Sequence, residues 1–144
     1  MEIAEIEVSY KTNSSTKVKI NRSLDAYNVL IDTWDFKKIE LQEEFKIIIL
    51  NRASQVLGIH SLSKGGTSAT IVDAKILFSV ALKCNASSII LAHNHPSGNL
   101  IPSNRDIELT KKLISASKFL DIQILDHLVV SKGGFYSLAD KEDM

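Results

Sequence analysis

Two histidines, a serine and an aspartate lie close together in the second half of the chain. His93 and His95 are separated by one residue and directly follow an apolar run, residues 88–92, while Ser103 and Asp106 come after a short loop. Side chains two positions apart on a strand project to the same face, so the two imidazoles can converge on one point. Two imidazoles and one carboxylate suit zinc in an open site where water completes the shell. The pattern predicts a zinc site made by His93, His95 and Asp106.

Each half of this pattern also has a simpler explanation. A histidine at the end of an apolar strand is commonly a hydrogen-bonded boundary residue, and the spacing of Ser103 and Asp106 is typical of a helix capping box. Capping and ligation are compatible, because a carboxylate has two oxygens and a helix N-terminus favours a negative charge. The loop that joins the two halves contains Pro96, Gly98 and Pro102, and a rigid loop of this kind can return a helix to the end of a strand. The whole pattern therefore favours a metal site.

The elements that would position these residues can be predicted from apolar periodicity and capping signals. A strand over 88–93 delivers the histidines, and a helix opens at Ser103 and ends near Asp121. Two further helices are expected after Ser23 and after Asp73, each of which is a typical N-cap residue. The remaining strands are expected at 2–10, 17–20, 45–50, 55–63, 122–130 and 135–138.

This order of elements predicts an α/β fold with a mixed, curved sheet flanked by helices in a single domain. Residues 1–40, an N-terminal strand pair and helix, are expected to belong to the same domain as residues 41–144. The 45–50 and 55–63 strands are separated by a short turn and predict a hairpin. The glycine loop that starts at Lys64 follows the second of these strands.

Composition narrows the functional classes. The 144 residues include 17 basic and 17 acidic side chains, so no net charge attracts the chain to nucleic acid or to a membrane surface. One cysteine, Cys84, excludes an internal disulfide and is expected in the core. The start resembles no signal peptide, and no apolar run approaches the ~20 residues that cross a bilayer. We therefore expect a soluble cytoplasmic protein, and its oligomeric state stays open.

Other common site chemistries are excluded by missing residues. A zinc-dependent nucleotide deaminase needs a pair of cysteines, which a chain with one cysteine cannot provide. The sequence contains no H-E-x-x-H and no G-x-S-x-G, so a helix-borne zinc protease site and a nucleophile elbow are both absent. The Gly65-Gly66 pair lacks the lysine and serine pattern of a phosphate-binding loop.

The residues resemble a known family. H-x-H followed by S-x-x-D is similar to the JAMM motif of the JAB/MPN metalloprotease fold, and residues 89–98 and 125–130 resemble its bacterial RadC branch. The resemblance covers residues 41–138 and implies a layering like that of cytidine deaminases. It implies zinc held by His93, His95 and Asp106, with Ser103 hydrogen-bonding a tetrahedral intermediate or the bound water. It also implies hydrolysis of a peptide or isopeptide bond in a peptide or protein partner.

One departure from the family concerns the general base. Peptidases of the family use a glutamate on an earlier strand, and counting back five positions from Gly66 places that residue at Ser61. There is no acidic residue between Phe45 and Thr70. Glu43 and Glu44 are expected to lie a whole strand away, so either could substitute only through a different geometry. A positioned base contributes about 10²–10⁴-fold in rate, so its loss would leave zinc with slow or absent hydrolysis.

Three other residues could supply the base, namely Asp73, Asp126 and His127, and spacing does not choose among them. For His127 a packed position beside the site is the stronger expectation. The sequence thus favours a zinc-dependent hydrolase only slightly over an inactive zinc-binding scaffold. A DNA-repair accessory role is ranked third, because residues 1–40 carry no helix-hairpin-helix signature and the net charge is zero.

Overall fold

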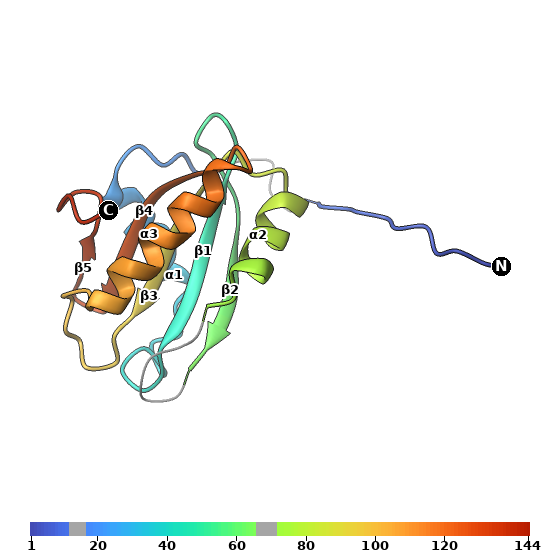
Figure 1. Ribbon diagram of the computed structural model, residues 1–144. Helices are drawn as coiled ribbons and strands as arrows, with labels where there is room; N and C mark the ends of the chain where they lie inside the picture. Colours follow the sequence, from blue (N-terminus) through green and yellow to red (C-terminus); the bar gives the residue numbers. More distant parts are fainter. Residues whose placement is uncertain (12–16, 66–71) are drawn as a thin grey trace.

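A computed structural model describes residues 1–11, 17–65 and 72–144. Its described part is a small α/β domain with a five-stranded sheet and three helices (Figure 1). The elements along the chain are α1 (Ser23–Thr33), β1 (Glu44–Leu50), β2 (Val56–Lys64), α2 (Ala74–Lys83), β3 (Ser88–Asn94), α3 (Asn104–Lys118), β4 (Gln123–Ser131) and β5 (Gly134–Ser137).

The strands lie side by side in the order β2-β1-β3-β4-β5. Strand β1 is antiparallel to both β2 and β3, β4 is antiparallel to β5, and β3 and β4 are parallel with α3 connecting them. The sheet is therefore mixed, and the predicted fold class and the predicted β1–β2 hairpin are confirmed. The central position of β3 is explained by its composition: all seven of its residues are buried.

Alternation along the strands divides the core into two layers. On β1, Phe45, Ile47 and Ile49 pack under α2 and α3, which cover the face toward the viewer in Figure 1. Ile48 and Leu50 point to the opposite face and pack against α1. The odd-numbered residues of β1 thus share the face on which α3 lies, a parity that decides which side chains reach the predicted metal site.

Helix α1 packs against its face of the sheet through a small number of buried residues. One of them, Leu30, is completely buried. We expect Leu30→Ala to lower the free energy of unfolding by about 2–5 kcal/mol, because it removes apolar contacts and leaves a cavity. Leu24→Ala on the same helix is the control, since Leu24 is exposed and should cost much less. Urea unfolding of both variants measures the difference, and equal losses would show that α1 is not docked as described.

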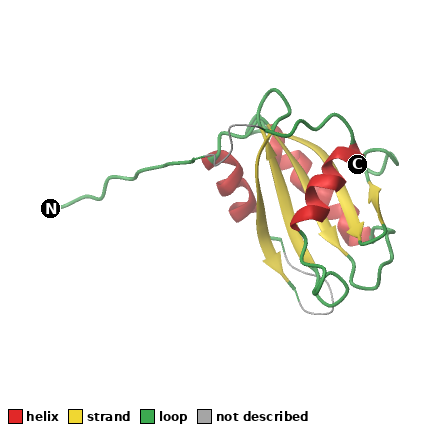
Figure 2. Ribbon diagram, turned by 180° about the vertical axis from the view of Figure 1, so that it is seen from behind, coloured by secondary structure: helices red, strands yellow, loops and turns green. Residues whose placement is uncertain are grey.

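The N-terminal segment differs from its prediction. Residues 1–11 form no strand and extend away from the body of the domain (Figure 2). Of the expected second strand, Lys19 alone forms a bridge, which pairs it with Gln55 just before β2. The predicted strand pair is therefore wrong: Ile3, Ile6 and Val8, the apolar residues on which the first strand was predicted, remain exposed.

Two of the three predicted helix caps are confirmed. Asp73 accepts the backbone N–H of Lys75 at the start of α2, and Ser103 caps α3. The prediction for α1 is wrong by one position, because Ser23 is the first helical residue and Arg22 occupies the cap, with Asp25 accepting its backbone N–H. Among the described helices, none is long and apolar enough to cross a membrane.

Candidate metal centre

Three side chains from β3, the loop behind it and α3 meet at one point. His93 lies near the end of β3, His95 follows it, and Asp106 stands in the first turn of α3. The Nε2 atoms of the two histidines are 3.0 Å apart. The Oδ2 atom of Asp106 lies 3.3 Å from Nε2 of His93 and 3.2 Å from Nε2 of His95. The structure therefore brings together the three residues that the sequence assigned to the metal.

The dimensions of this triangle match those of a tetrahedral zinc site. Ligand atoms bound at about 2.0–2.1 Å with tetrahedral angles lie about 3.3 Å from one another. The three edges observed here, 3.0, 3.2 and 3.3 Å, are close to that value. One face of such a tetrahedron is thus formed by the side chains alone, which leaves a fourth position for water or substrate.

Ser103 and Asp106 also form the capping box that was the alternative explanation. The Ser103 hydroxyl accepts the backbone N–H of Asp106 at 3.1 Å, and Oδ2 of Asp106 accepts the backbone N–H of Ser103 at 2.8 Å. The same oxygen faces the two histidines, so the cap orients the carboxylate toward them. The predicted compatibility of capping and convergence is confirmed, while the catalytic role given to Ser103 stays a prediction.

Hydrogen bonds fix the proton on His95. Its Nδ1 atom lies 2.7 Å from the carbonyl oxygen of Asn99, to which only a protonated nitrogen can donate. In the neutral ring Nε2 is therefore bare and faces the site, whereas in the protonated ring it donates to the Asp106 carboxylate. This hydrogen bond of the charged form raises the pKa of His95, and burial opposes the shift. Burial would raise the pKa of the Asp106 carboxyl, but its hydrogen bonds with His93, His95 and Ser103 outweigh burial and hold the pKa well below its usual range.

His93 is fixed from the other side of the ring by His127. Nδ1 of His93 lies 2.7 Å from Nε2 of His127, and Nδ1 of His127 lies 2.6 Å from the hydroxyl of Thr110. Burial lowers the pKa of His127 well below its usual value, with the neighbouring His93 as a further cause, so this ring is neutral. The expectation that His127 packs beside the site is confirmed.

The residues present fit a cation on chemical grounds. With the Nδ1 atoms of His93 and His95 hydrogen-bonded outward, their Nε2 atoms and the Asp106 carboxylate present lone pairs to one another within 3.3 Å. Three acceptors at this distance repel one another unless a positive charge, a proton on an imidazole or a metal ion, lies among them. Two imidazoles and a carboxylate form a donor set that zinc accepts.

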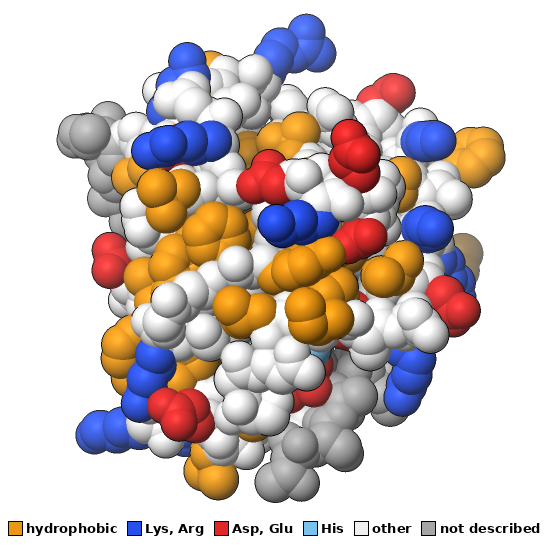
Figure 3. All heavy atoms as spheres, turned by 90° about the vertical axis from the view of Figure 1, so that its left-hand side faces the viewer, with side chains coloured by type: hydrophobic (Ala, Val, Ile, Leu, Met, Phe, Trp, Pro, Cys, Tyr) orange, Lys and Arg blue, Asp and Glu red, His pale blue; other side chains and the backbone are white. Residues whose placement is uncertain are grey.

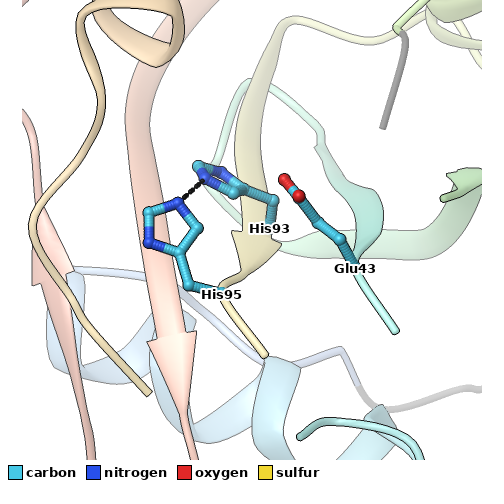
Figure 4. Close-up of side chains that lie close together, drawn as sticks. All are labelled: Glu43, His93 and His95. Atoms are coloured by element: carbon cyan, nitrogen blue, oxygen red, sulfur yellow. Dashed lines mark hydrogen bonds between the residues drawn. The ribbon is translucent and has the colours of Figure 1, made fainter. Parts of the chain in front are cut away.

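A fourth side chain, Glu43, joins this cluster, although local spacing in the sequence offered no reason to place it there. An oxygen of its carboxylate and one nitrogen from each of His93 and His95 all lie within 4.8 Å of one another (Figure 4). Glu43 is 8 % exposed and is therefore buried, although it carries a carboxylate. The expectation that this glutamate lies a whole strand away from the site is wrong, because β1 and β3 are adjacent strands.

The register of the sheet explains the position of Glu43. Phe45 of β1 pairs with His93 of β3, and paired residues project to the same face. Glu43 precedes Phe45 by two residues and continues this face, on which α3 carries Asp106. The hydrogen bond from the backbone N–H of Gly65 to the carbonyl of Glu43 prolongs the β1–β2 ladder to this residue. Pairing of non-consecutive strands thus brings the carboxylate to the histidines.

The position that spacing assigned to the base, Ser61, lies on the other face. Ser61 pairs with Lys46, whose Nζ atom donates to the carbonyl of Thr33 at 2.9 Å at the end of α1. The hydroxyl of Ser61 donates to the carboxylate of Glu44. Ser61 is therefore on the α1 side of the sheet, opposite His93. Counting from Gly66, which lies outside the described residues, selected a side chain of the wrong strand and the wrong parity.

The three other residues considered for the base have structural partners. Asp73 caps α2. Asp126 accepts the hydroxyl of Ser137 at 2.6 Å and backbone N–H groups of its own strand and of Ala139, and its pKa is raised by burial despite these bonds. His127 is completely buried between His93 and Thr110. Among the described acidic residues considered for the general base, Glu43 is the one that reaches the cluster.

Little of the histidine cluster reaches the molecular surface. His93 and His127 are at most 1 % exposed. On the face shown in Figure 3 histidine surface is confined to one small patch, and acidic and basic side chains are interspersed around hydrophobic ones. His93 therefore lies beneath the surface while His95 and Asp106 are partly exposed, and electrostatic interactions at such a site are stronger than in bulk water.

The fold and the cluster define a class of protein: a mixed α/β domain with side chains that could hold a metal ion where its central strand ends and the next helix begins. The chain belongs to the RadC-like JAB domain family, whose model matches residues 20–143. The match includes α1, so the family domain begins before residue 41 and contains the helix that the sequence analysis placed in its N-terminal segment.

Several curated relatives carry a family name without a stated activity. A UPF0758 protein of Flavobacterium johnsoniae is 41 % identical over 124 residues, which is 85 % of this chain and 52 % of the relative. A UPF0758 protein of Alkaliphilus metalliredigens is 37 % identical over 145 aligned residues, covering 99 % of this chain and 61 % of the relative. The chain thus spans between half and two thirds of the length of these two relatives.

Proposed function

We propose that this domain is a zinc-dependent hydrolase that cleaves a peptide or isopeptide bond, with His93, His95 and Asp106 as metal ligands and Glu43 as general base. The observation that carries the proposal is the placement of a second buried carboxylate, that of Glu43, beside three converging ligand atoms. A purely structural zinc site would use a closed set of four protein ligands. Here we assign three protein ligands, Asp106 and the two histidines. The carboxylate of Glu43 reaches them from a different strand and is assigned to the base.

The side chains divide the work of hydrolysis among them. A zinc ion held here would lower the pKa of a coordinated water toward ~7 and polarise a carbonyl. Glu43 is placed to accept a proton from the attacking water and to deliver it to the leaving amine. The hydroxyl of Ser103 lies at the N-terminus of α3. Its proton can be donated to an oxygen that becomes negative in the reaction. His95 and Asp106 keep their donor atoms oriented through Asn99 and the helix cap.

The scaffold hypothesis depended on a missing base, and the position of Glu43 removes that argument. A DNA-binding role has no observation in its favour on the described residues: the net charge is zero, and both signs of charge are interspersed on the face shown in Figure 3. Hydrolysis is therefore the function that this geometry supports best.

The test begins with metal content and ends with turnover. We expect about one zinc per chain in purified protein by elemental analysis, and loss of the metal in His95→Ala. Zinc-loaded protein should cleave members of fluorogenic peptide and isopeptide libraries, a chelator should stop cleavage, and added zinc should restore it. His60→Ala is the matched control, because His60 is exposed on β2 and has no part in the cluster. Fully loaded protein that cleaves no amide in either library would contradict the proposal.

A further inference from the structure

A buried line of hydrogen bonds connects two of the proposed ligands through residues that touch no solvent. It starts at the backbone carbonyl of Asp106, which accepts the hydroxyl of Thr110 at 2.6 Å. The same hydroxyl oxygen lies 2.6 Å from Nδ1 of His127, and Nε2 of His127 lies 2.7 Å from Nδ1 of His93. Thr110 and His127 are each completely buried. The line joins α3, β4 and β3 behind the site.

The donors and acceptors on this line allow a single assignment of protons. A threonine hydroxyl has one hydrogen, and the bond to the Asp106 carbonyl uses it, so the oxygen faces His127 as an acceptor. Nδ1 of His127 must then carry the hydrogen, which leaves its Nε2 bare in the neutral ring. That bare atom accepts from His93, so Nδ1 of His93 carries the hydrogen and Nε2 of His93 is bare.

We propose that Thr110 and His127 are positioning residues that hold His93 in the one tautomer whose Nε2 can bind a metal ion. The inference rests on the proposed metal centre and adds two residues that would not touch the metal. Histidine ligands are commonly oriented by a partner on their other nitrogen, and loss of such a partner weakens metal binding about 10–100-fold. In this chain the partner is a second histidine, whose own tautomer must be set by the threonine.

Because the line has two steps, its far end provides a sharp test. Thr110→Val keeps the shape of the side chain and removes the hydroxyl, so Nδ1–H of His127 loses its acceptor in a buried position. The favoured response is for His127 to move its hydrogen to Nε2, which then donates to Nδ1 of His93 and leaves the hydrogen of His93 on Nε2. Thr110→Ser keeps the hydroxyl and is the matched control.

Two measurements read the result. Competition against a chromophoric chelator gives the zinc affinity, which we expect to fall about 10–100-fold in Thr110→Val and to stay near that of the parent in Thr110→Ser. Long-range proton–nitrogen NMR of the zinc-free protein reports the tautomer of His93: hydrogen on Nδ1 in the parent and in the serine variant, and on Nε2 in the valine variant. An unchanged tautomer with an unchanged affinity in Thr110→Val would overturn the inference.

A second pair of variants tests the near end of the line. His127→Gln offers an amide oxygen to His93 and an amide N–H to Thr110, whereas His127→Leu offers neither, so zinc affinity should be higher in the glutamine variant. Equal affinities in the two variants would overturn the role of His127. Should the parent itself bind no zinc, the proposed hydrolase fails, and the tautomer measured in the zinc-free parent still decides the positioning role.

Discussion

Glu43→Gln is expected to lower the rate of amide hydrolysis about 10²–10⁴-fold while zinc remains bound. The amide is nearly the same size as the carboxylate and removes its ability to accept a proton. His93, His95 and Asp106 keep the hydrogen bonds that orient them, since these run to His127, Asn99 and the backbone of Ser103. Turnover per bound zinc, measured with elemental analysis on the same samples, separates a lost base from a lost metal.

The neighbouring residue supplies the control for this experiment. Glu44 follows Glu43 in the chain, but its carboxylate accepts the hydroxyl of Ser61 on the opposite face of the sheet. Glu44→Gln should therefore leave turnover per zinc near that of the parent, and Ser61→Ala should do the same. A Glu43→Gln variant with the turnover of the parent would show that another group accepts the proton.

The difference between Glu43 and the other site residues shows what a sequence can reveal about a site. His93, His95 and Asp106 lie on one strand, one loop and one helix that follow each other, so local spacing was enough to predict their convergence. Glu43 reaches them through the pairing of β1 with β3, between which β2 and α2 intervene in the chain. Strand order and register are set by tertiary packing, and local spacing carries no information about either.

The helices and strands themselves were easier to predict from the sequence than the pairing of the strands. Strands with dense apolar residues, such as Phe45–Leu50, and helices with a polar cap were predicted close to their observed bounds because burial and capping act locally. The segment 2–10 has the alternation of a strand but finds no described neighbour to pair with. A strand is stable only as part of a sheet, and its own sequence does not identify the strand with which it pairs.

Asn94 shows how a residue between two ligands can support a third side chain. Its alternation with His93 directs it to the opposite face of β3, where it is completely buried. Its Oδ1 atom accepts the backbone N–H of Glu44 at 2.7 Å, and Nδ2 donates to the carbonyls of Ile39 at 2.7 Å and Gln42 at 2.9 Å. Two of these partners flank Glu43 in the chain, so the side chain of Asn94 clamps the backbone that carries the proposed base.

We expect Asn94→Ala to lower the free energy of unfolding by about 3 kcal/mol, because three backbone groups lose their partner at once. Turnover per zinc should fall as well, by up to ~10²-fold, since a displacement of about 1 Å at Glu43 is enough to disturb proton transfer. Zinc content should stay near that of the parent, because the side chain of Asn94 points away from the cluster.

The same substitution at the other end of β1 separates the two effects. Asn51 follows β1 and accepts the backbone N–H groups of Ala53 and Gln55 in the turn toward β2. Asn51→Ala should therefore destabilise the fold without altering turnover per zinc at temperatures where the protein is folded. If both alanine variants reduce turnover equally, the loss in Asn94→Ala reflects general destabilisation. A loss confined to Asn94→Ala would mean that the central residue of H-N-H holds the glutamate in place while its two neighbours hold the metal.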